Sequence, residues 1–456
     1  MVPYVLRTRQ HPIAAHAEDA SNHTRNPATA RGTPIADHEG TPRIPDITGN
    51  NQLTVIESAN TPSATDADGT GLKEDDMLGW NGGDGPAFGN LIVRRQEERD
   101  LRERGEEAVA EEDAAERPQD SPTAHTPSVI SLGQVWVDIM MNVDGLPKPG
   151  GFAVSTATRP VVGGSYRVLD AVSRMGVPAE HAGIIGNGVW ASAIRDEYEK
   201  AGIMHVGPSR LDTDSGFRLV FHDDEGRKTF IAQYGAEAHG DEHTFDTLEP
   251  ESGDVVHISG NTMLDHTAAG IDEFMHRADT DPKKRPYRLV INPTNTLKLV
   301  NDHLLEDLVL AHPTWSCNRQ EATTLAERLG VPIDDDMVLT VGGGFDQAMN
   351  TLCDALGNTL RAPLVVRAGS RGAWVRNPGG EVEHIEGFPT KGVHTRSAGA
   401  CHTGVMCATL AKGWSLTDAV RIANAAASLA IQRHIAGVPV CPSYKEATAL
   451  AGVAAR

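Results

Sequence analysis

From residue 128 onward, short apolar runs alternate with stretches in which apolar residues recur at helical spacing. The β-branched apolar runs predict strands at 129–132, 135–139, 255–259, 288–292, 364–367 and 373–376. The helical spacing predicts helices at 168–175, 191–201, 320–329, 345–356, 404–412 and 416–434. Strands interleaved with helices form a parallel sheet covered on both faces. We therefore expect one α/β domain over residues 128–445 and a C-terminal tail over 446–456, with the first two runs forming a strand pair or one bulged strand.

A β-hairpin interrupts this alternation. Residues 217–223 and 228–233 are typical strands, and Asp224, Glu225 and Gly226 between them supply the residues of a tight turn. We expect this hairpin and the segment near 139–160 to form a small β element added to the α/β domain.

The first 127 residues differ from the rest in composition. They carry 12 Lys and Arg against 23 Asp and Glu, which is a net charge of −11 out of −21 for the whole chain. They also hold only three of the 21 aromatic residues but 11 of the 27 prolines. Such a segment buries too little apolar surface to offset its ordering entropy. We expect a largely disordered acidic arm over residues 1–127, with a local helix where opposite charges recur between 90 and 116.

Charge and composition exclude several classes of protein. The net charge of −21 argues against general binding to nucleic acids or anionic membranes. No apolar run approaches the roughly 18 residues of a membrane span, and the N-terminus lacks the apolar core of a secretory signal. The five cysteines are scattered and indicate neither a disulfide framework nor a zinc site. We expect a soluble, cytoplasmic protein.

Three glycine-bearing segments carry candidate chemistry. They span 162–169, with Gly163, Gly164 and Arg167; 365–373, with Arg367, Gly369 and Gly372; and 392–404, with Ser397, Ala398, Gly399 and Ala400. Paired glycines before a helix allow a ligand close to the backbone, although a tight turn explains the first segment equally well. A loop of small residues that opens a helix makes an anion site, and this suits a phosphate.

The order and spacing of these segments resemble the PfkB/ribokinase family of carbohydrate and nucleoside kinases. The resemblance extends over about residues 128–445. Further matches are residues 133–138 with Asp138, 183–186, the hairpin 224–230, the NxxE pattern of Asn318 and Glu321, and Asn424. It implies a three-layer α/β/α fold with a small β lid, transfer of a phosphoryl group from ATP to a hydroxyl of a sugar or nucleoside, and Mg²⁺. Lid strands that pair between two copies would give a homodimer.

The resemblance also implies a role for each matched residue. Asp138 would accept hydrogen bonds from substrate hydroxyls, beside Gly163, Gly164 and Arg167. The nucleotide would lie against Arg367, Gly369, Gly372 and Asn424. Asn318 and Glu321 would position Mg²⁺ indirectly, through water and phosphate. The backbone amides of Ser397, Ala398, Gly399 and Ala400 would stabilise charge on the transferred group.

Departures from the family pattern predict impaired catalysis. The family's catalytic Asp aligns with Ala400, which has no proton acceptor, and Arg167 stands where the family has a substrate-binding Asn. Arg367 replaces a Thr and could still hold a phosphate. Ser397 replaces a glycine, a mild change if the backbone there does not need a positive φ.

Several alternatives follow from these departures. His402 or His394 could supply a substitute base, or both could be ordinary loop or surface residues. Arg167 could face the pocket, which would favour a phosphorylated or carboxylated substrate, or could point to solvent. The chain could be an impaired sugar kinase, or a non-catalytic regulatory protein that binds a nucleotide or sugar. In a third interpretation the kinase fold is a scaffold and the acidic arm recruits partners.

Overall fold

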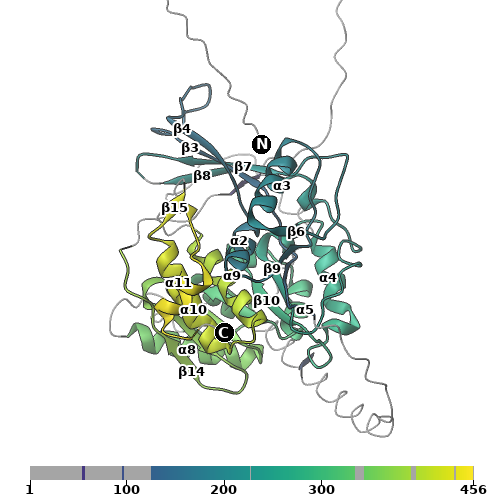
Figure 1. The fold of residues 1–456 in the computed structure, drawn as a ribbon, viewed down its shortest axis with the longest axis vertical. Helices are drawn as coiled ribbons and strands as arrows, with labels where there is room; N and C mark the ends of the chain where they lie inside the picture. Colours follow the sequence, from purple (N-terminus) through teal and green to yellow (C-terminus); the bar gives the residue numbers. More distant parts are fainter. Residues whose placement is uncertain are drawn as a thin grey trace, which may run out of the picture. The chain divides into compact units, whose positions relative to one another are not determined.

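The computed structural model describes residues 54–56, 95–96, 125–225, 227–333, 344–391, 397–435 and 438–454. Within these residues, the largest sheet has the strand order β14-β13-β12-β11-β10-β9-β2-β5-β6. Figure 1 shows β9 and β10 of this sheet among the helices of the α/β domain. Its strands are β2 (Val129–Ser131), β5 (Ala179–His181), β6 (Ile203–His205), β9 (Val255–Ser259), β10 (Arg288–Asn292), β11 (Thr314–Asn318), β12 (Leu364–Arg367), β13 (Ala373–Arg376) and β14 (Val382–Ile385). From β12 to β6 neighbouring strands pair in parallel, and β13 and β14 join antiparallel at one edge. This is the predicted α/β architecture.

Helices cover both faces of this sheet. The helices are α2 (Tyr166–Arg174), α3 (Val189–Ala201), α4 (Ala268–His276), α5 (Asp302–Leu310), α6 (Arg319–Arg328), α8 (Phe345–Leu360), α9 (Ala398–Ala411), α10 (Leu416–Ala430) and α11 (Tyr444–Ala451). One core cluster joins the sheet to α2, α3, α9, α10 and α11, and the other joins it to α4, α5, α6 and α8. Helix α11 buries Ala447 and Ala451, so the packed fold continues past the boundary expected at residue 445.

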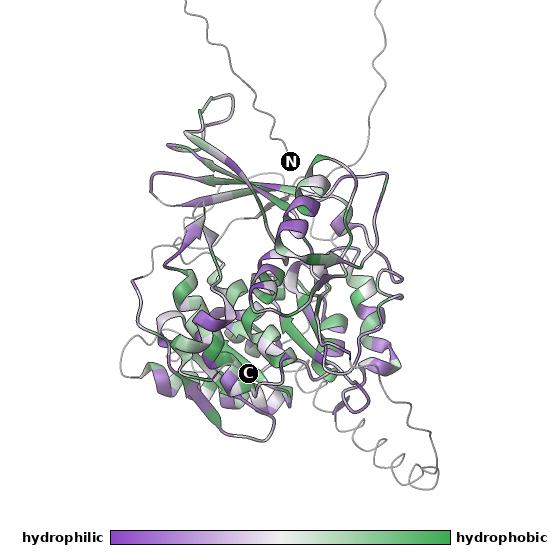
Figure 2. Cartoon of the chain, viewed as in Figure 1, coloured by the Kyte–Doolittle hydropathy of each residue, from purple (hydrophilic) through white to green (hydrophobic). Residues whose placement is uncertain are grey.

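Alternation along single strands divides the core between the two faces. On β12, Val365 packs in the first cluster while Leu364 and Val366 pack in the second, and on β13 Trp374 points opposite to its neighbours. Successive side chains of a strand point to opposite faces, so strands that are apolar at every position must be covered twice. Figure 2 shows the resulting contrast between the hydrophobic large sheet and the mixed lid strands.

A smaller sheet, here called the lid, has the order β1-β8-β7-β3-β4 in the described part of the chain. Its strands are β1 (Thr54–Ile56), β3 (Val137–Asn142), β4 (Ala157–Val162), β7 (Phe217–His222) and β8 (Lys228–Gln233). Strands β7 and β8 form the predicted hairpin, and β3 pairs in parallel with β7. Strands β2 and β3 belong to different sheets, so the expectation of one strand pair or one bulged strand was wrong.

Most of the acidic arm lies outside the described residues, and so does the predicted helix at 90–116 apart from Arg95 and Gln96. The described exceptions contact the domain. Strand β1 pairs antiparallel with β8, with Val55 opposite Ile231. Arg95 Nη1 lies 2.7 Å from the Glu306 carboxylate on α5. In the described residues, no helix is long and apolar enough to cross a membrane.

Candidate active site

The predicted site residues gather at the carboxyl ends of the parallel strands. Asn318 and Arg367 are the last residues of β11 and β12, and Asp138 lies near the start of lid strand β3. Helix α9 begins beside them, after Ser397. Ligands of open α/β sheets bind at this edge because the loops there leave a crevice.

Asp138 is fully buried and surrounded by donors. Its Oδ1 accepts hydrogen bonds from Trp136 Nε1 at 3.0 Å and from Arg218 Nε at 2.9 Å. Its Oδ2 accepts from Nη2 of Arg218 and from Nη2 of Arg167, each at 3.2 Å. Two guanidinium groups therefore share one carboxylate, and the three side chains together carry a net positive charge.

Arg218, from lid strand β7, was not among the predicted site residues. Its guanidinium lies 5.1 Å from the centre of the Trp136 ring and 5.0 Å from that of Phe230, distances typical of cation–π contacts. The parallel pairing of β3 with β7 places Arg218 directly beside Asp138. A lone arginine in the apolar run 217–223 was the available signal, but the pairing partner of that strand could not be read from the run itself.

Arg167, in the first turn of α2, faces the site and not the solvent. Its side chain is only 11% exposed, and besides Asp138 it contacts Ser397, donating from Nη1 to Oγ at 2.9 Å. Burial lowers the pKa of Arg167, Asp138 opposes that shift, and the neighbouring Arg218 adds to it. Arg167 thus connects the carboxylate expected to bind substrate with the turn expected to bind phosphate.

The paired glycines before α2 are explained by packing around Asp138. A Cβ on Gly163 would lie 3.0 Å from Asp138 Oδ2, and a Cβ on Gly164 would lie 2.3 Å from the Gln134 carbonyl oxygen. Gly164 also has a φ of +64°, which side chains rarely adopt. Gly164 therefore needs glycine in this fold, whereas Gly163 leaves little room beside Asp138. Contact of either glycine with a substrate stays a prediction.

The N-terminus of α9 has the geometry of an anion site. Ser397, Ala398, Gly399 and Ala400 form its half-buried first turn, where backbone N–H groups have no partner within the helix. Ser397 has a φ of +63°, so this backbone does require the left-handed region. The condition under which serine would be a mild replacement is therefore not met, because such a conformation costs a non-glycine residue about 1 kcal/mol or more. The hydrogen bond from Arg167 holds the serine side chain in place.

His402 cannot serve as the substitute base in this arrangement. It is buried, and its Nε2 lies 3.1 Å from Oδ1 of Asn424 on α10. Burial lowers the pKa of His402 to about 3, with Arg367 contributing in the same direction. The imidazole is therefore neutral and engaged within the core. The other candidate, His394, lies outside the described residues.

Asn424, on α10, is hydrogen-bonded to α9 and to the segment at the end of β14. Its Nδ2 donates to the carbonyl oxygens of Ile385 at 3.0 Å and Glu386 at 3.2 Å, while Oδ1 faces His402. This links α10, α9 and the end of β14. A direct contact of Asn424 with nucleotide stays a prediction.

Arg367 cross-links the strand ends and α9. Its guanidinium donates to the carbonyl oxygens of Cys317 at 3.2 Å, Ser316 at 3.3 Å and Gly399 at 3.0 Å. Its Nη2 also lies 3.4 Å from Glu321 Oε2. A Cβ on Gly399 would lie 2.6 Å from Nη1 of Arg367, so this glycine makes room for the guanidinium.

Asn318 and Glu321 form the capping box of α6. Asn318 Oδ1 accepts from the Glu321 N–H at 2.9 Å, and the Asn318 N–H donates to Glu321 Oε2 at 2.7 Å. Asn318 Nδ2 donates to Oε1 of the same carboxylate at 2.7 Å. The Glu321 carboxylate is thus already hydrogen-bonded on both oxygens and paired with Arg367, so direct Mg²⁺ ligation does not fit. An indirect role through water stays a prediction.

Gly369 and Gly372 flank a turn between β12 and β13. Both have positive φ, at +60° and +89°. A Cβ on Gly372 would lie 2.1 Å from the Ile385 carbonyl oxygen, whereas one on Gly369 would meet no atom within 4 Å. Of the two, Gly369 leaves open space beside the backbone, and its contact with nucleotide stays a prediction.

Comparison with known proteins shows which family the chain resembles in sequence. The family model for pfkB family carbohydrate kinase matches residues 126–442. The chain is 28% identical over 303 residues to the uncharacterized sugar kinase YegV of Escherichia coli strain K12, covering 66% of this chain and 87% of that protein. It is 27% identical over 312 residues to the ATP-dependent ribose-1-phosphate kinase of Halopiger xanaduensis, covering 67% of this chain and 92% of the relative.

Solved structures share the fold. Ribokinase from Cryptococcus neoformans var. grubii serotype A, in complex with ADP, matches with a TM-score of 0.57 and 18% identity over 72% of this chain and 99% of that chain. Arabidopsis thaliana ribokinase complexed with ribose and ATP matches with a TM-score of 0.56 and 18% identity, over 72% of this chain and 100% of that chain. The expected ribokinase-like architecture is confirmed.

Proposed function

The chain belongs to the pfkB family of carbohydrate kinases, and we propose that it binds a sugar or nucleoside bearing a phosphate or carboxylate, with phosphoryl transfer from ATP strongly slowed by Ala400. The observation that carries this proposal is the pairing of Arg167 and Arg218 around the single carboxylate of Asp138. The excess positive charge suits an anionic substrate.

The expected recognition follows from the chemistry of the two arginines. A guanidinium binds phosphate or carboxylate through parallel N–H donors, whereas neutral hydroxyls need no charge. For Asp138 to accept hydrogen bonds from the hydroxyls of the same substrate, Arg167 or Arg218 would have to release its contact with that carboxylate. One relative is described as a ribose-1-phosphate kinase, and the substrate in its name carries both a phosphate and free hydroxyls.

The expected slowing follows from the missing base. Ala400 offers a methyl group where the family removes a proton from the attacking hydroxyl, and a positioned base contributes typically about 10²- to 10⁴-fold in rate. His402 does not replace it, since Asn424 holds the imidazole in the core.

The residues present suit the anionic part of ATP better than the metal. The first turn of α9 and the nearby Arg367 favour phosphate oxygens, because both present N–H donors and positive charge. ATP would supply the transferred phosphoryl group. Glu321 is paired with Arg367, and we assign no step to a metal held by that carboxylate.

A second candidate is a non-catalytic regulatory protein that binds nucleotide or sugar. The hydrogen bond between Arg167 and Ser397 favours it, because that guanidinium lies between the expected substrate and phosphate positions. A regulator would bind ligands as the impaired kinase does but would not gain turnover when a base is restored.

The test compares binding and turnover for matched ligands. ATP hydrolysis and product formation would be measured with ribose, ribose 1-phosphate, fructose 6-phosphate and adenosine, alongside the thermal shift given by each ligand. We expect the sugar phosphates to raise the melting temperature, and the Arg218→Met variant to lose that shift. Arg174→Ala, which removes an exposed arginine from the same helix as Arg167, should keep it. Equal shifts with neutral and phosphorylated sugars would refute the proposed substrate class, and rapid turnover by the unmodified chain would refute the impairment.

A further inference from the structure

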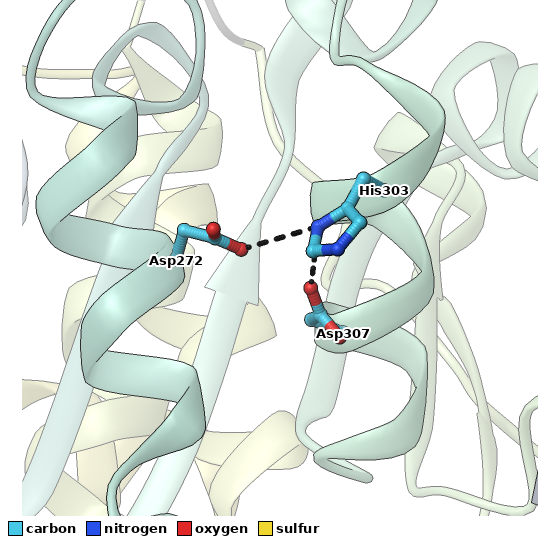
Figure 3. A group of neighbouring side chains, drawn as sticks. All are labelled: Asp272, His303 and Asp307. Carbon is cyan, nitrogen blue, oxygen red and sulfur yellow. Dashed lines mark ion pairs between the residues drawn. The ribbon is translucent and has the colours of Figure 1, made fainter.

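A cluster of histidines and aspartates joins α4 to α5, apart from the site described above. Asp272 and His276 are one helical turn apart on α4, and His303 and Asp307 are one turn apart on α5. Residues at this spacing share a helix face, so the two pairs point toward each other across the helix interface. Figure 3 shows Asp272, His303 and Asp307 converging from the two helices.

Three donor atoms of this cluster lie close enough together to ligate one small metal ion after small adjustments. His303 Nδ1 lies 3.0 Å from Asp307 Oδ2 and 3.5 Å from Asp272 Oδ1. His276 Nε2 lies 3.6 Å from Asp307 Oδ1. For metal–ligand bonds of about 2.0–2.2 Å, tetrahedral ligands lie about 3.3–3.6 Å apart.

The two carboxylates converge on one imidazole, and both form ion pairs with His303 when it is protonated. Oδ1 of Asp272 and Oδ2 of Asp307 are buried, and His303 Nδ1 is the nitrogen that both of them face. A cation between them would satisfy both oxygens.

We propose that Asp272, His303 and Asp307 bind a first-row divalent transition metal such as Zn²⁺. Imidazole and carboxylate ligands suit Zn²⁺ and its neighbours, whereas Mg²⁺ and Ca²⁺ prefer oxygen ligands alone. The three ligand atoms already lie within 4.8 Å of one another, so little rearrangement is needed.

The position of this site indicates a structural role. Helices α4 and α5 pack on the sheet face opposite to α9, in the core cluster that excludes the residues around Ala400. The metal would connect two neighbouring helices and contact no residue of the candidate active site. Its effect should therefore be on stability, since an ion that binds only the folded state shifts the folding equilibrium toward it.

The experiment uses the full chain after removal of metals with a chelator. Zn²⁺ binding would be measured by calorimetric titration, with Co²⁺ absorption as a second readout of nitrogen and oxygen ligation. We expect His303→Ala and Asp307→Asn each to lose one equivalent of tightly bound Zn²⁺ and the associated rise in melting temperature. His243→Ala is the matched control, because His243 is an exposed histidine 2.9 Å from Asp246 and belongs to neither α4 nor α5, and it should keep both.

The Asp307→Asn variant separates metal loss from misfolding. It removes a carboxylate that faces Asp272, so its metal-free melting temperature should equal or exceed that of the unmodified chain. Loss of one Zn²⁺ equivalent by a folded Asp307→Asn protein would support the site. Unchanged Zn²⁺ stoichiometry in both variants, or a thermal shift equally large in variants and unmodified chain, would overturn it, as would the absence of Zn²⁺ binding by the unmodified chain.

Discussion

Arg167 donates a hydrogen bond to Asp138 over 3.2 Å, joining the first turn of α2 to lid strand β3. The same guanidinium reaches Ser397 before α9, so one side chain joins the lid residue Asp138 to the turn that we propose binds an anion. In the resembling family a neutral amide stands at this position. The charge of Arg167, together with the methyl group of Ala400, should therefore decide which substrates react.

Restoring the base should have an effect that depends on the substrate. Ala400→Asp should raise turnover on a sugar phosphate by about 10²-fold or more, the typical contribution of a positioned base. Turnover on neutral ribose should rise only when Arg167→Asn is added, because the two changes act on one transition state. A coupled ATPase assay with product identification measures both.

Two comparisons decide this prediction. The double variant Ala400→Asp with Arg174→Asn controls for loss of a cation from α2 and should behave like Ala400→Asp alone. If Ala400→Asp leaves turnover unchanged on every substrate while ligand binding persists, the regulatory interpretation holds and the impaired-kinase proposal fails.

Replacing Arg367 should destabilise the domain. Arg367→Thr removes the guanidinium that donates hydrogen bonds to the carbonyl oxygens of Cys317, Ser316 and Gly399. It also removes the positive charge that pairs with the buried Glu321 carboxylate. Breaking such a buried charged network costs about 3 kcal/mol of unfolding free energy. Urea unfolding measures the loss. Arg371→Thr is the control, because Arg371 is a more exposed arginine in the turn that follows β12. It should change the free energy of unfolding by no more than about 0.5 kcal/mol. Equal losses in the two variants would contradict the assigned role of Arg367.

Buried histidines should make the fold acid-sensitive. Burial lowers the pKa of His402 to about 3, that of His181 to about 3 and that of His257 to about 4. Above pH 6.5 these imidazoles are neutral in both states, but below it the unfolded chain takes up protons that the folded chain excludes. Stability should therefore fall as the pH drops from 6.5 toward 4, with each histidine contributing up to about 1.4 kcal/mol per pH unit.

His402→Gln tests this sign. The glutamine amide can still face Asn424, so the variant should fold and should lose less stability than the unmodified chain between pH 6.5 and 5. His243→Gln should not flatten the profile, because Asp246 raises the pKa of that exposed histidine and the linkage has the opposite sign. An unchanged slope for His402→Gln would show that the imidazole is not held neutral.

Two deletions of different length should show which part of the N-terminal arm stabilises the domain. Deletion of residues 1–52 keeps β1 and Arg95, and the melting temperature should stay within a few degrees. Deletion of residues 1–124 strips β1 from β8 and leaves Glu306 without Arg95, so we expect a lower melting temperature and concentration-dependent association through the exposed strand edge.

A point substitution controls for the loss of chain length. Val55→Pro disrupts the pairing of β1 with β8 in the full-length protein, and it should reproduce the association without the deletion. Equal behaviour of both truncations and the unmodified chain in light scattering and thermal unfolding would contradict a stabilising role for β1.

Local patterns predicted much of the fold. The strands at 255–259, 288–292, 364–367 and 373–376 have the predicted bounds, because apolar β-branched runs buried on both faces leave little ambiguity. The glycine segments also gather at one sheet edge, as strand ends must. The separation of β2 from β3 was missed because a pattern of single residues does not say which sheet a strand joins.

The site was only partly predictable for the same reason. Arg218 reaches Asp138 through the parallel register of β3 with β7, and β1 reaches β8 from a distant part of the chain. Such long-range pairing leaves no local signal. The sequence also did not predict the strained backbone at Ser397, because a positive φ at a serine is imposed by the surrounding structure and not by the residue type.

Helix α9 is buried along its length from Cys401 to Ala411, between the helices that flank it. A helix packed on every side cannot shift without repacking its neighbours, because protein interiors are as dense as organic crystals. The half-buried lid strands β7 and β8 have fewer such constraints. An anion bound at the turn that we propose for it would therefore find that turn already in place, and closure around the anion would require movement of the lid and not of α9.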